Sequence, residues 1–117
     1  MSETLTIVIK SAIKPGKAAE LKDILNEVIA HCKVTEPGML QYDWYINEDE
    51  SECMVIEQYA SSDDLLFHFG NYVDWRPKMD ACREMREVNL LGSPSEKLKE
   101  LLSRANPNIY GNFIRLE

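Results

Sequence analysis

The chain has 117 residues, of which 44% are hydrophobic, so it has room for one domain with a single core of modest size. Its 13 basic and 20 acidic residues give a net charge of -7, which repels phosphate backbones and argues against a nucleic-acid partner. The first residues lack a basic region followed by an apolar stretch, and no apolar run reaches membrane-spanning length, so we expect a cytoplasmic protein with no membrane partner.

The first elements predicted are a strand and a long helix. Apolar and polar residues alternate from Leu5 to Ile13, which is the period of a strand with one buried face. Pro15-Gly16 interrupts this pattern. From about Lys17 to Lys33, apolar residues recur at helical spacing with charged residues on the other side, which predicts an amphipathic helix.

A hairpin is predicted next. Glu36-Pro37-Gly38 breaks the chain before an alternation rich in aromatic residues that runs from Leu40 to Ile46. The acidic stretch Asn47 to Glu52 is too polar to be buried and is interpreted as the connection. A second strand is expected from Cys53 to Tyr59.

The second half of the chain begins with another helix. Ser61 or Ser62 is placed to cap it, and its apolar stripe would be Leu65, Leu66 and Phe69. A short helical piece is expected over Trp75 to Met85, followed by a last main strand from Glu87 to Leu91.

A final unit is predicted after Gly92. Ser93-Pro94-Ser95-Glu96 has the pattern of a capping box with Pro94 at the first helical position, and Asn106-Pro107 would end the helix. Ile109 to Leu116 is expected to be a short extended tail. We therefore expect one domain over residues 1–117, with a core at about 4–92 and a C-terminal extension at about 93–117.

The predicted order of elements defines the fold class. The order β-α-β-β-α-β is typical of the α+β ferredoxin-like fold, in which an antiparallel sheet carries helices on one face. Both alternating residue sets of the strands are partly apolar, with Val8 and Ile56 on the side away from Ile7 and Val55. An apolar, uncovered sheet face needs a partner, so we expect a homodimer that packs face to face.

Three segments of the chain resemble the antibiotic biosynthesis monooxygenase domain family, in particular its quinol monooxygenase-like branch. They are the run from Glu36 to Tyr42, the run from Val55 to Ser61, and His68 on the helix that follows. The stretch Glu87 to Pro94 with the extra helix after it is similar to the extended members of that family. The resemblance implies a dimeric α+β barrel.

The resemblance also makes His68 the candidate catalytic residue. A histidine there is able to act as a general base, because a phenol or hydroquinone anion is a better electron donor to molecular oxygen than the neutral compound. The reaction would then need no metal or flavin cofactor, and its partners would be oxygen and a small aromatic molecule. The alternative interpretation of His68 is a helix-face histidine satisfied by water or a carboxylate.

Other residues are candidates for substrate binding, each with a structural alternative. Aromatic residues on the paired strands form a possible wall for a planar substrate, or else belong to the core or dimer interface. Glu57 is costly to bury unless it pairs with a lysine or arginine, which we prefer, or orients His68. Residues after the second helix are expected to border a cavity, where Arg76 is able to recognise an acidic substituent. The full set is Tyr42, Trp44, Glu57, Tyr59, Tyr72, Trp75 and Arg76.

Two functions remain open on the sequence. The first is a cofactor-independent, quinol-type monooxygenase with His68 as its base. The second is a dimeric small-molecule binding protein of the same fold without turnover. No motif for metal binding or phosphate binding occurs, and Cys32, Cys53 and Cys82 are interpreted as buried thiols.

Overall fold

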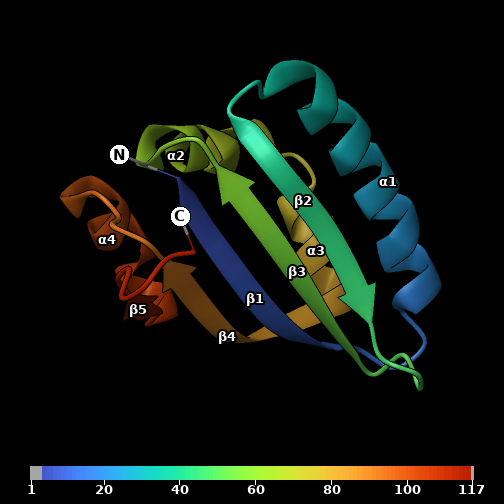
Figure 1. Cartoon of the computed structure of the whole chain (residues 1–117). Coiled ribbons are helices and arrows are strands. Elements are labelled where there is room, and N and C mark those ends of the chain that lie inside the picture. Colours follow the sequence, from blue (N-terminus) through green and yellow to red (C-terminus); the bar gives the residue numbers. More distant parts are fainter. Residues whose placement is uncertain (1–3, 117) are drawn as a thin grey trace.

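The computed structural model describes residues 4–116 and shows a mixed α+β fold with one sheet (Figure 1). The sheet order is β2-β3-β1-β4-β5, and the first four strands are antiparallel to their neighbours. In chain order the elements are β1 (Leu5–Ile13), α1 (Ala18–Thr35), β2 (Met39–Ile46), β3 (Glu52–Tyr59), α2 (Ser62–Asn71), α3 (Arg76–Cys82), β4 (Arg83–Leu91), α4 (Glu96–Leu102), a 3-10 turn η1 (Ser103–Ala105) and β5 (Asn108–Tyr110). The predicted ferredoxin-like order is thus confirmed.

Local chemistry explains the element boundaries. Gly16 has a φ of 75°, a left-handed conformation that suits glycine, and it turns the chain from β1 into α1. The hydroxyl of Ser61 accepts a hydrogen bond from the backbone N–H of Asp64, which caps α2 as predicted. Asn106 adopts the left-handed conformation just after η1 and ends the C-terminal helical unit.

The second half of the chain differs from the prediction in four places. The helical piece expected over Trp75 to Met85 ends at Cys82. β4 begins at Arg83, several residues before the expected Glu87, because the charged run at its start conceals the strand pattern. The N-cap of α4 is Ser95, whose hydroxyl accepts from the backbone N–H of Leu98, so Pro94 precedes the helix and is not its first residue. The expected tail after Pro107 includes a strand, since β5 pairs in parallel with the end of β4.

The core lies between the sheet and the helices that cover one of its faces (Figure 1). Apolar residues of α1 pack with α3, with the C-terminal end of β1 and with the N-terminal end of β3. A second cluster joins β1, α2, β4 and α4. The fully buried members with the largest side chains include Leu5, Ile7, Tyr59, Leu65, Met79, Leu90 and Leu98. All three cysteines are buried and free, as predicted.

The other face of the sheet carries apolar residues without a covering element. Val8 and Ile56 are paired across β1 and β3 and are partly exposed, and Tyr45 and Met54, paired across β2 and β3, are 52% and 36% exposed. This surface is the one on which the predicted homodimer depends. Among residues 4–116, no helix is both long enough and apolar enough to cross a bilayer.

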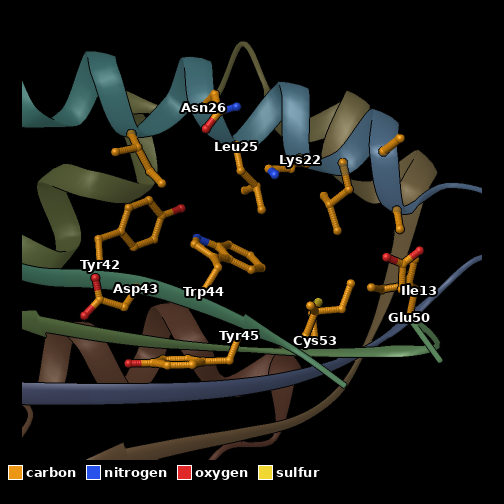
Figure 2. Close-up of a pocket in the computed structure, with 15 residues that line it drawn as sticks. Ile13, Lys22, Leu25, Asn26, Tyr42, Asp43, Trp44, Tyr45, Glu50 and Cys53 are labelled. Carbon is orange, nitrogen blue, oxygen red and sulfur yellow. The ribbon is translucent and has the colours of Figure 1, made fainter. Parts of the chain in front are cut away.

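A large groove of about 750 Å³ opens between α1 and the edge strand β2 (Figure 2). Leu25 and Asn26 of α1 face it from one side, and Tyr42 and Trp44 of β2 face it from the other. Its lining includes no histidine, and its one cysteine is the buried thiol of Cys53. Tyr42 and Trp44 also line a second cavity, which contains the titratable residues Glu57 and His68.

Candidate active site

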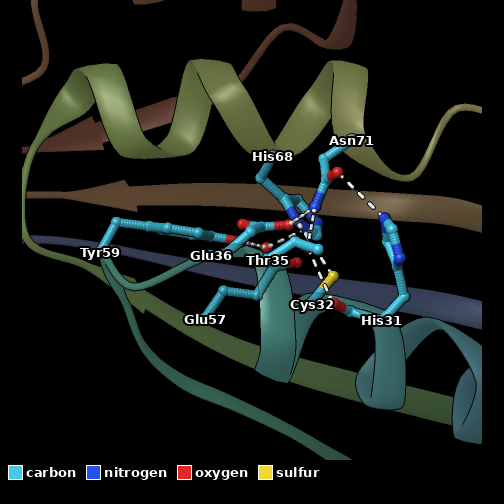
Figure 3. A network of polar contacts seen from close by, with 8 residues as sticks. All are labelled: His31, Cys32, Thr35, Glu36, Glu57, Tyr59, His68 and Asn71. Atoms are coloured by element: carbon cyan, nitrogen blue, oxygen red, sulfur yellow. Dashed lines mark hydrogen bonds and ion pairs between the residues drawn. The ribbon is translucent and has the colours of Figure 1, made fainter.

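His68 lies at the centre of a buried polar network on the helix-covered side of the sheet (Figure 3). Its Nδ1 atom is 2.8 Å from Oε2 of Glu36, and both side chains are about 2% exposed. Glu36 follows the last turn of α1, whereas His68 lies on the buried side of α2. Because an ionised carboxylate only accepts hydrogen bonds, Nδ1 carries the ring proton and a neutral imidazole presents its lone pair on Nε2.

Glu36 is held in its ionised form by two hydrogen bonds to one oxygen. The Nδ2 atom of Asn71 donates to the same Oε2, at 2.8 Å, and to the hydroxyl of Thr35, also at 2.8 Å. His31 Nε2 lies 3.0 Å from the amide oxygen of Asn71 and fixes its orientation. Burial by itself raises the pKa of Glu36, but the hydrogen bonds from His68 and Asn71 outweigh burial and hold that pKa below its usual range.

Glu57 approaches the other nitrogen of the same imidazole. Its Oε1 atom is 3.9 Å from His68 Nε2 and accepts a 2.6 Å hydrogen bond from the Tyr59 hydroxyl. Burial raises the pKa of Glu57, and this effect exceeds the opposing influence of His68 and Tyr59. The site therefore combines one carboxyl group whose pKa is lowered, one whose pKa is raised, and an imidazole between them.

Cys32 completes the network from the last turns of α1. Its Sγ atom is 3.8 Å from His68 Nδ1, and burial, followed by the nearby Glu36, raises the pKa of its thiol. A thiol in this environment is not an activated nucleophile. Within residues 4–116, Cys32, Glu36 and His68 are also the set whose ligand atoms lie close enough to hold a cation, at 4.8 Å or less from one another. The hydrogen bonds already account for the arrangement of Glu36 and His68.

His68 lines a cavity of about 360 Å³ together with Glu57, whose carboxyl lies on the Nε2 side of the imidazole. Tyr72 stacks on the imidazole with ring centroids 4.6 Å apart and an interplanar angle of 14°, and Tyr42 meets the ring edge-on at 5.3 Å. Apolar residues of β1, β4, α3 and the C-terminal unit form the remaining walls. The lining includes Ile7, Ile9, Phe69, Met79, Met85, Val88, Leu101 and Leu102.

The structure brings most of the predicted site residues to this one cavity. The residues that line it are Tyr42, Trp44, Glu57, His68, Tyr72 and Arg76. Tyr59 lies behind Glu57 and positions it, without lining the cavity. Trp75 points elsewhere, since its indole N–H donates to Glu27 and its ring packs on His31, 4.9 Å away. The lysine or arginine partner preferred for Glu57 is not found among the described residues, where the Tyr59 hydroxyl takes that place.

Sequence reasoning missed the role of Glu36. Glu36 was noted only as part of the family pattern and not as a site residue, because its partner His68 lies 32 positions away in the chain. A local signal was available: Val28, Cys32 and Glu36 continue the buried stripe of α1 at helical spacing, which indicates a buried carboxylate. Arg83 was missed as well, because the strand that begins there was placed too late in the sequence.

The chain belongs to the antibiotic biosynthesis monooxygenase family. The family model of that description matches residues 4–87, which contain every titratable member of the His68 network. MupZ from Pseudomonas fluorescens is 19% identical, with a TM-score of 0.89 over 100% of this chain and 91% of that one. SnoaB from Streptomyces nogalater, described as a cofactor-independent oxygenase, is 14% identical, with a TM-score of 0.69 over 80% of this chain and 96% of that one.

At these identities, the two structures establish the shared fold. A comparison of the sequence with curated proteins gives no match. The activity of this chain must therefore be argued from the site itself.

Proposed function

We propose that the protein is a cofactor-independent monooxygenase that deprotonates a small hydroxylated aromatic or hydroquinone-type compound and transfers one atom of molecular oxygen to it. The observation that supports this most directly is the fixed imidazole of His68. Its Nδ1 atom lies 2.8 Å from Glu36 Oε2, and its Nε2 atom is on the side of Glu57, with which His68 lines a cavity rich in aromatic residues. A base held in one tautomer next to an apolar cavity is suited to remove a proton from a bound hydroxyl group.

Proton removal makes the reaction with oxygen feasible. When Nε2 takes the proton of a phenolic hydroxyl, the resulting anion transfers one electron to oxygen, giving a substrate radical and superoxide. These two combine to form a carbon–oxygen bond and a peroxide. The peroxide anion first takes the proton back from His68. Nε2 then removes the hydrogen on the same ring carbon as the O–O bond breaks, which leaves one oxygen atom on the ring as a quinone carbonyl and releases the other as hydroxide. The hydroxide is protonated to water, and the proton on His68 afterwards returns to the group that supplied it.

Glu57 is placed to supply the proton that the hydroxide requires. Its carboxyl lies 3.9 Å from His68 Nε2 and therefore on the reacting side of the ring. Because burial raises its pKa, the carboxyl is more readily protonated than an exposed glutamate, and it is able to donate to the leaving hydroxide. Tyr59 donates a 2.6 Å hydrogen bond to Glu57 and acts as a positioning residue.

The cavity walls fit a flat substrate. Tyr72 lies parallel to the imidazole, so a planar ring that enters beside them meets aromatic surfaces on the strands and on the segment after α2. Burial raises the pKa of both Tyr42 and Tyr72, so these phenols remain neutral and are able to donate hydrogen bonds. A volume of about 360 Å³ is within the range of small-molecule sites.

The test is oxygen uptake by metal-stripped protein with a panel of hydroquinones and polyphenols. Replacing the base by His68→Gln is expected to lower the rate by about 10²- to 10⁴-fold, the usual contribution of a general base. Lys78→Gln, an exposed change on α3, serves as the matched control and is expected to leave the rate within about twofold of the original.

Isotopically labelled oxygen then separates the reaction types. One labelled atom in the product and one in water support a monooxygenase, whereas labelled hydrogen peroxide as the sole reduced product contradicts it. No uptake above background with any compound also contradicts the proposal and favours a binding protein of the same fold.

A further inference from the structure

Arg83, the first residue of β4, is a buried cation beside the candidate active site. Its side chain lines the same cavity as His68, and the residue is only 7% exposed. One guanidinium nitrogen donates to the Ser11 hydroxyl at 2.9 Å, and the guanidinium carbon lies 5.4 Å from the ring centroid of Trp44. Its Nε atom is buried and has no hydrogen-bond partner.

No carboxylate within residues 4–116 lies within ion-pair distance of Arg83, although Glu57, which lines the same cavity, interacts with it electrostatically without contact. A buried charge without a counter-ion in contact is costly, because the solvation it loses is not replaced. The hydroxyl of Ser11 and the face of Trp44 offer only partial compensation. A bound anion would satisfy both the charge and the unused donors of the guanidinium group.

Two further arginines stand at the rim of the same cavity. Arg76 lies at the start of α3, with its guanidinium carbon 5.9 Å from the Tyr72 ring centroid, and Arg104 comes from η1. Glu57 is the only carboxylate among the residues that line the cavity. In a chain of net charge -7, this cavity is thus locally positive, which attracts anionic ligands.

The sheet register gives the spacing between the cation and the base. Tyr42 pairs with Glu57, and Trp44, over which Arg83 lies, pairs with Val55 two residues further along. Two residues of a strand extend about 7 Å, which is close to the length of one substituted aromatic ring. A ring whose hydroxyl group contacts His68 therefore extends toward Arg83.

We propose that Arg83, assisted at the rim by Arg76 and Arg104, binds a carboxylate of the substrate and orients its hydroxyl-bearing ring toward His68. A carboxylate fits because a single buried guanidinium needs one negative charge and binds the two oxygens side by side. The inference rests on the proposed function only in placing the reacting hydroxyl at His68. The substrate class is then a hydroxylated aromatic acid.

The experiment compares gentisate, a hydroquinone carboxylate, with gentisamide, its neutral amide of the same shape. Dissociation constants are measured without oxygen by isothermal titration, for the original protein and for Arg83→Gln, Arg83→Lys and Arg86→Gln. Arg86 is an exposed arginine of the same strand, paired with Glu84, and provides the matched control. Circular dichroism and urea unfolding establish that each variant is folded.

The original protein and Arg86→Gln are expected to bind the acid at least tenfold more tightly than the amide. Arg83→Gln is expected to lose this preference, and Arg83→Lys to retain part of it. Arg104→Gln, an exposed change that leaves the core intact, is expected to reduce the preference by a smaller factor and keeps the test valid if Arg83→Gln does not fold.

The proposal is overturned if acid and amide bind equally to the original protein, if neither binds measurably, or if Arg83→Gln keeps the full preference. These results are separate from the fate of the proposed reaction. A protein that prefers the acid but consumes no oxygen retains the anion site and loses the monooxygenase function. If oxygen uptake depends on His68 but the protein shows no preference for the acid, the monooxygenase function is retained and the anion site is lost.

Discussion

The substitution Glu36→Gln tests the centre of the network, because it changes the charge of Glu36 and keeps its shape. The Oε2 atom of Glu36 accepts from His68 and Asn71, both at 2.8 Å, while its Oε1 atom is buried without a partner. An amide that keeps both hydrogen bonds must place its NH₂ group at the buried Oε1 position. If the amide is reversed, it donates to Nδ1, the ring proton moves to Nε2, and the lone pair on Nε2 is lost.

The expected cost follows from these contacts. A hydrogen bond to a charged group contributes about 1.5–3 kcal/mol and a neutral one about 1 kcal/mol, so the two weakened bonds together lose about 1–4 kcal/mol. A buried NH₂ group without an acceptor adds about 1–3 kcal/mol. We therefore expect Glu36→Gln to lower the free energy of unfolding by about 2–7 kcal/mol at neutral pH. Urea unfolding, followed by circular dichroism, measures this value.

The pH dependence provides a second readout. The pKa of Glu36 is held below its ordinary value, so its ionisation stabilises the fold above the ordinary glutamate pKa of about 4.3. This contribution is lost as the pH falls through the lower pKa of the folded state. The difference in stability between the original protein and Glu36→Gln is therefore expected to shrink in acid.

Glu48→Gln, an exposed change in the hairpin, is the control and is expected to shift stability by less than about 0.5 kcal/mol. The reasoning is refuted if Glu36→Gln costs no more than this control at neutral pH. If the loss of unfolding free energy in Glu36→Gln is large but stays constant down to pH 3, the ionised state of Glu36 is refuted. The loss would then come only from the altered hydrogen bonds and packing.

The remaining predictions concern Glu57 and the uncovered sheet face. Since burial raises the pKa of Glu57, its stabilising contribution is present below the ordinary glutamate pKa and is lost as the pH rises through the higher pKa of the folded state. Glu57→Gln is thus expected to gain stability relative to the original protein as the pH rises toward neutral, and to lose about 100-fold or more in oxygen uptake. For the sheet face, we propose that Val8 and Ile56 pack against a second copy, so that Val8→Lys yields a monomer in size-exclusion chromatography.

Each of these predictions has its own contradictory result. Urea midpoints that fall in parallel for Glu57→Gln and the original protein between pH 5 and 8 would contradict the raised pKa. Val34→Lys is the control for the sheet face, since Val34 lies on α1 and is 84% exposed. An original protein that elutes as a monomer, or a Val8→Lys variant that remains dimeric, would contradict the proposed interface.

The sequence predicts those parts of the fold that local patterns encode. The alternation from Leu5 to Ile13 and the break at Pro15-Gly16 give β1 within its observed bounds. β4 is predicted too short because Arg83 and the charged residues after it do not alternate with apolar ones. Arg83 is buried because it contacts Ser11 and lies over the ring of Trp44. Ser11 is 72 positions away in the chain, so no local pattern indicates this burial.

The candidate site divides in the same way. His68 is found because the chain resembles a family pattern with a histidine at this place, and its aromatic neighbours Tyr42 and Trp44 are found because they alternate along β2. The hydrogen bond between Glu36 and His68 depends on how the end of α1 packs on α2, and no periodicity in either segment encodes that contact. Trp75 illustrates the opposite error, since its proximity in sequence to Tyr72 does not place it in the cavity.

The C-terminal unit supplies part of the cavity lining from outside the segment that the family model matches. Glu36, Glu57 and His68 all lie within the segment that the family model matches, whereas the part of the cavity rim formed by α4 and η1 lies beyond it. The structural match to MupZ extends over the whole chain, and that to SnoaB over 80% of it. Under the proposed function, sequence change after residue 95 would remodel one part of the cavity rim and leave Glu36, Glu57 and His68 untouched.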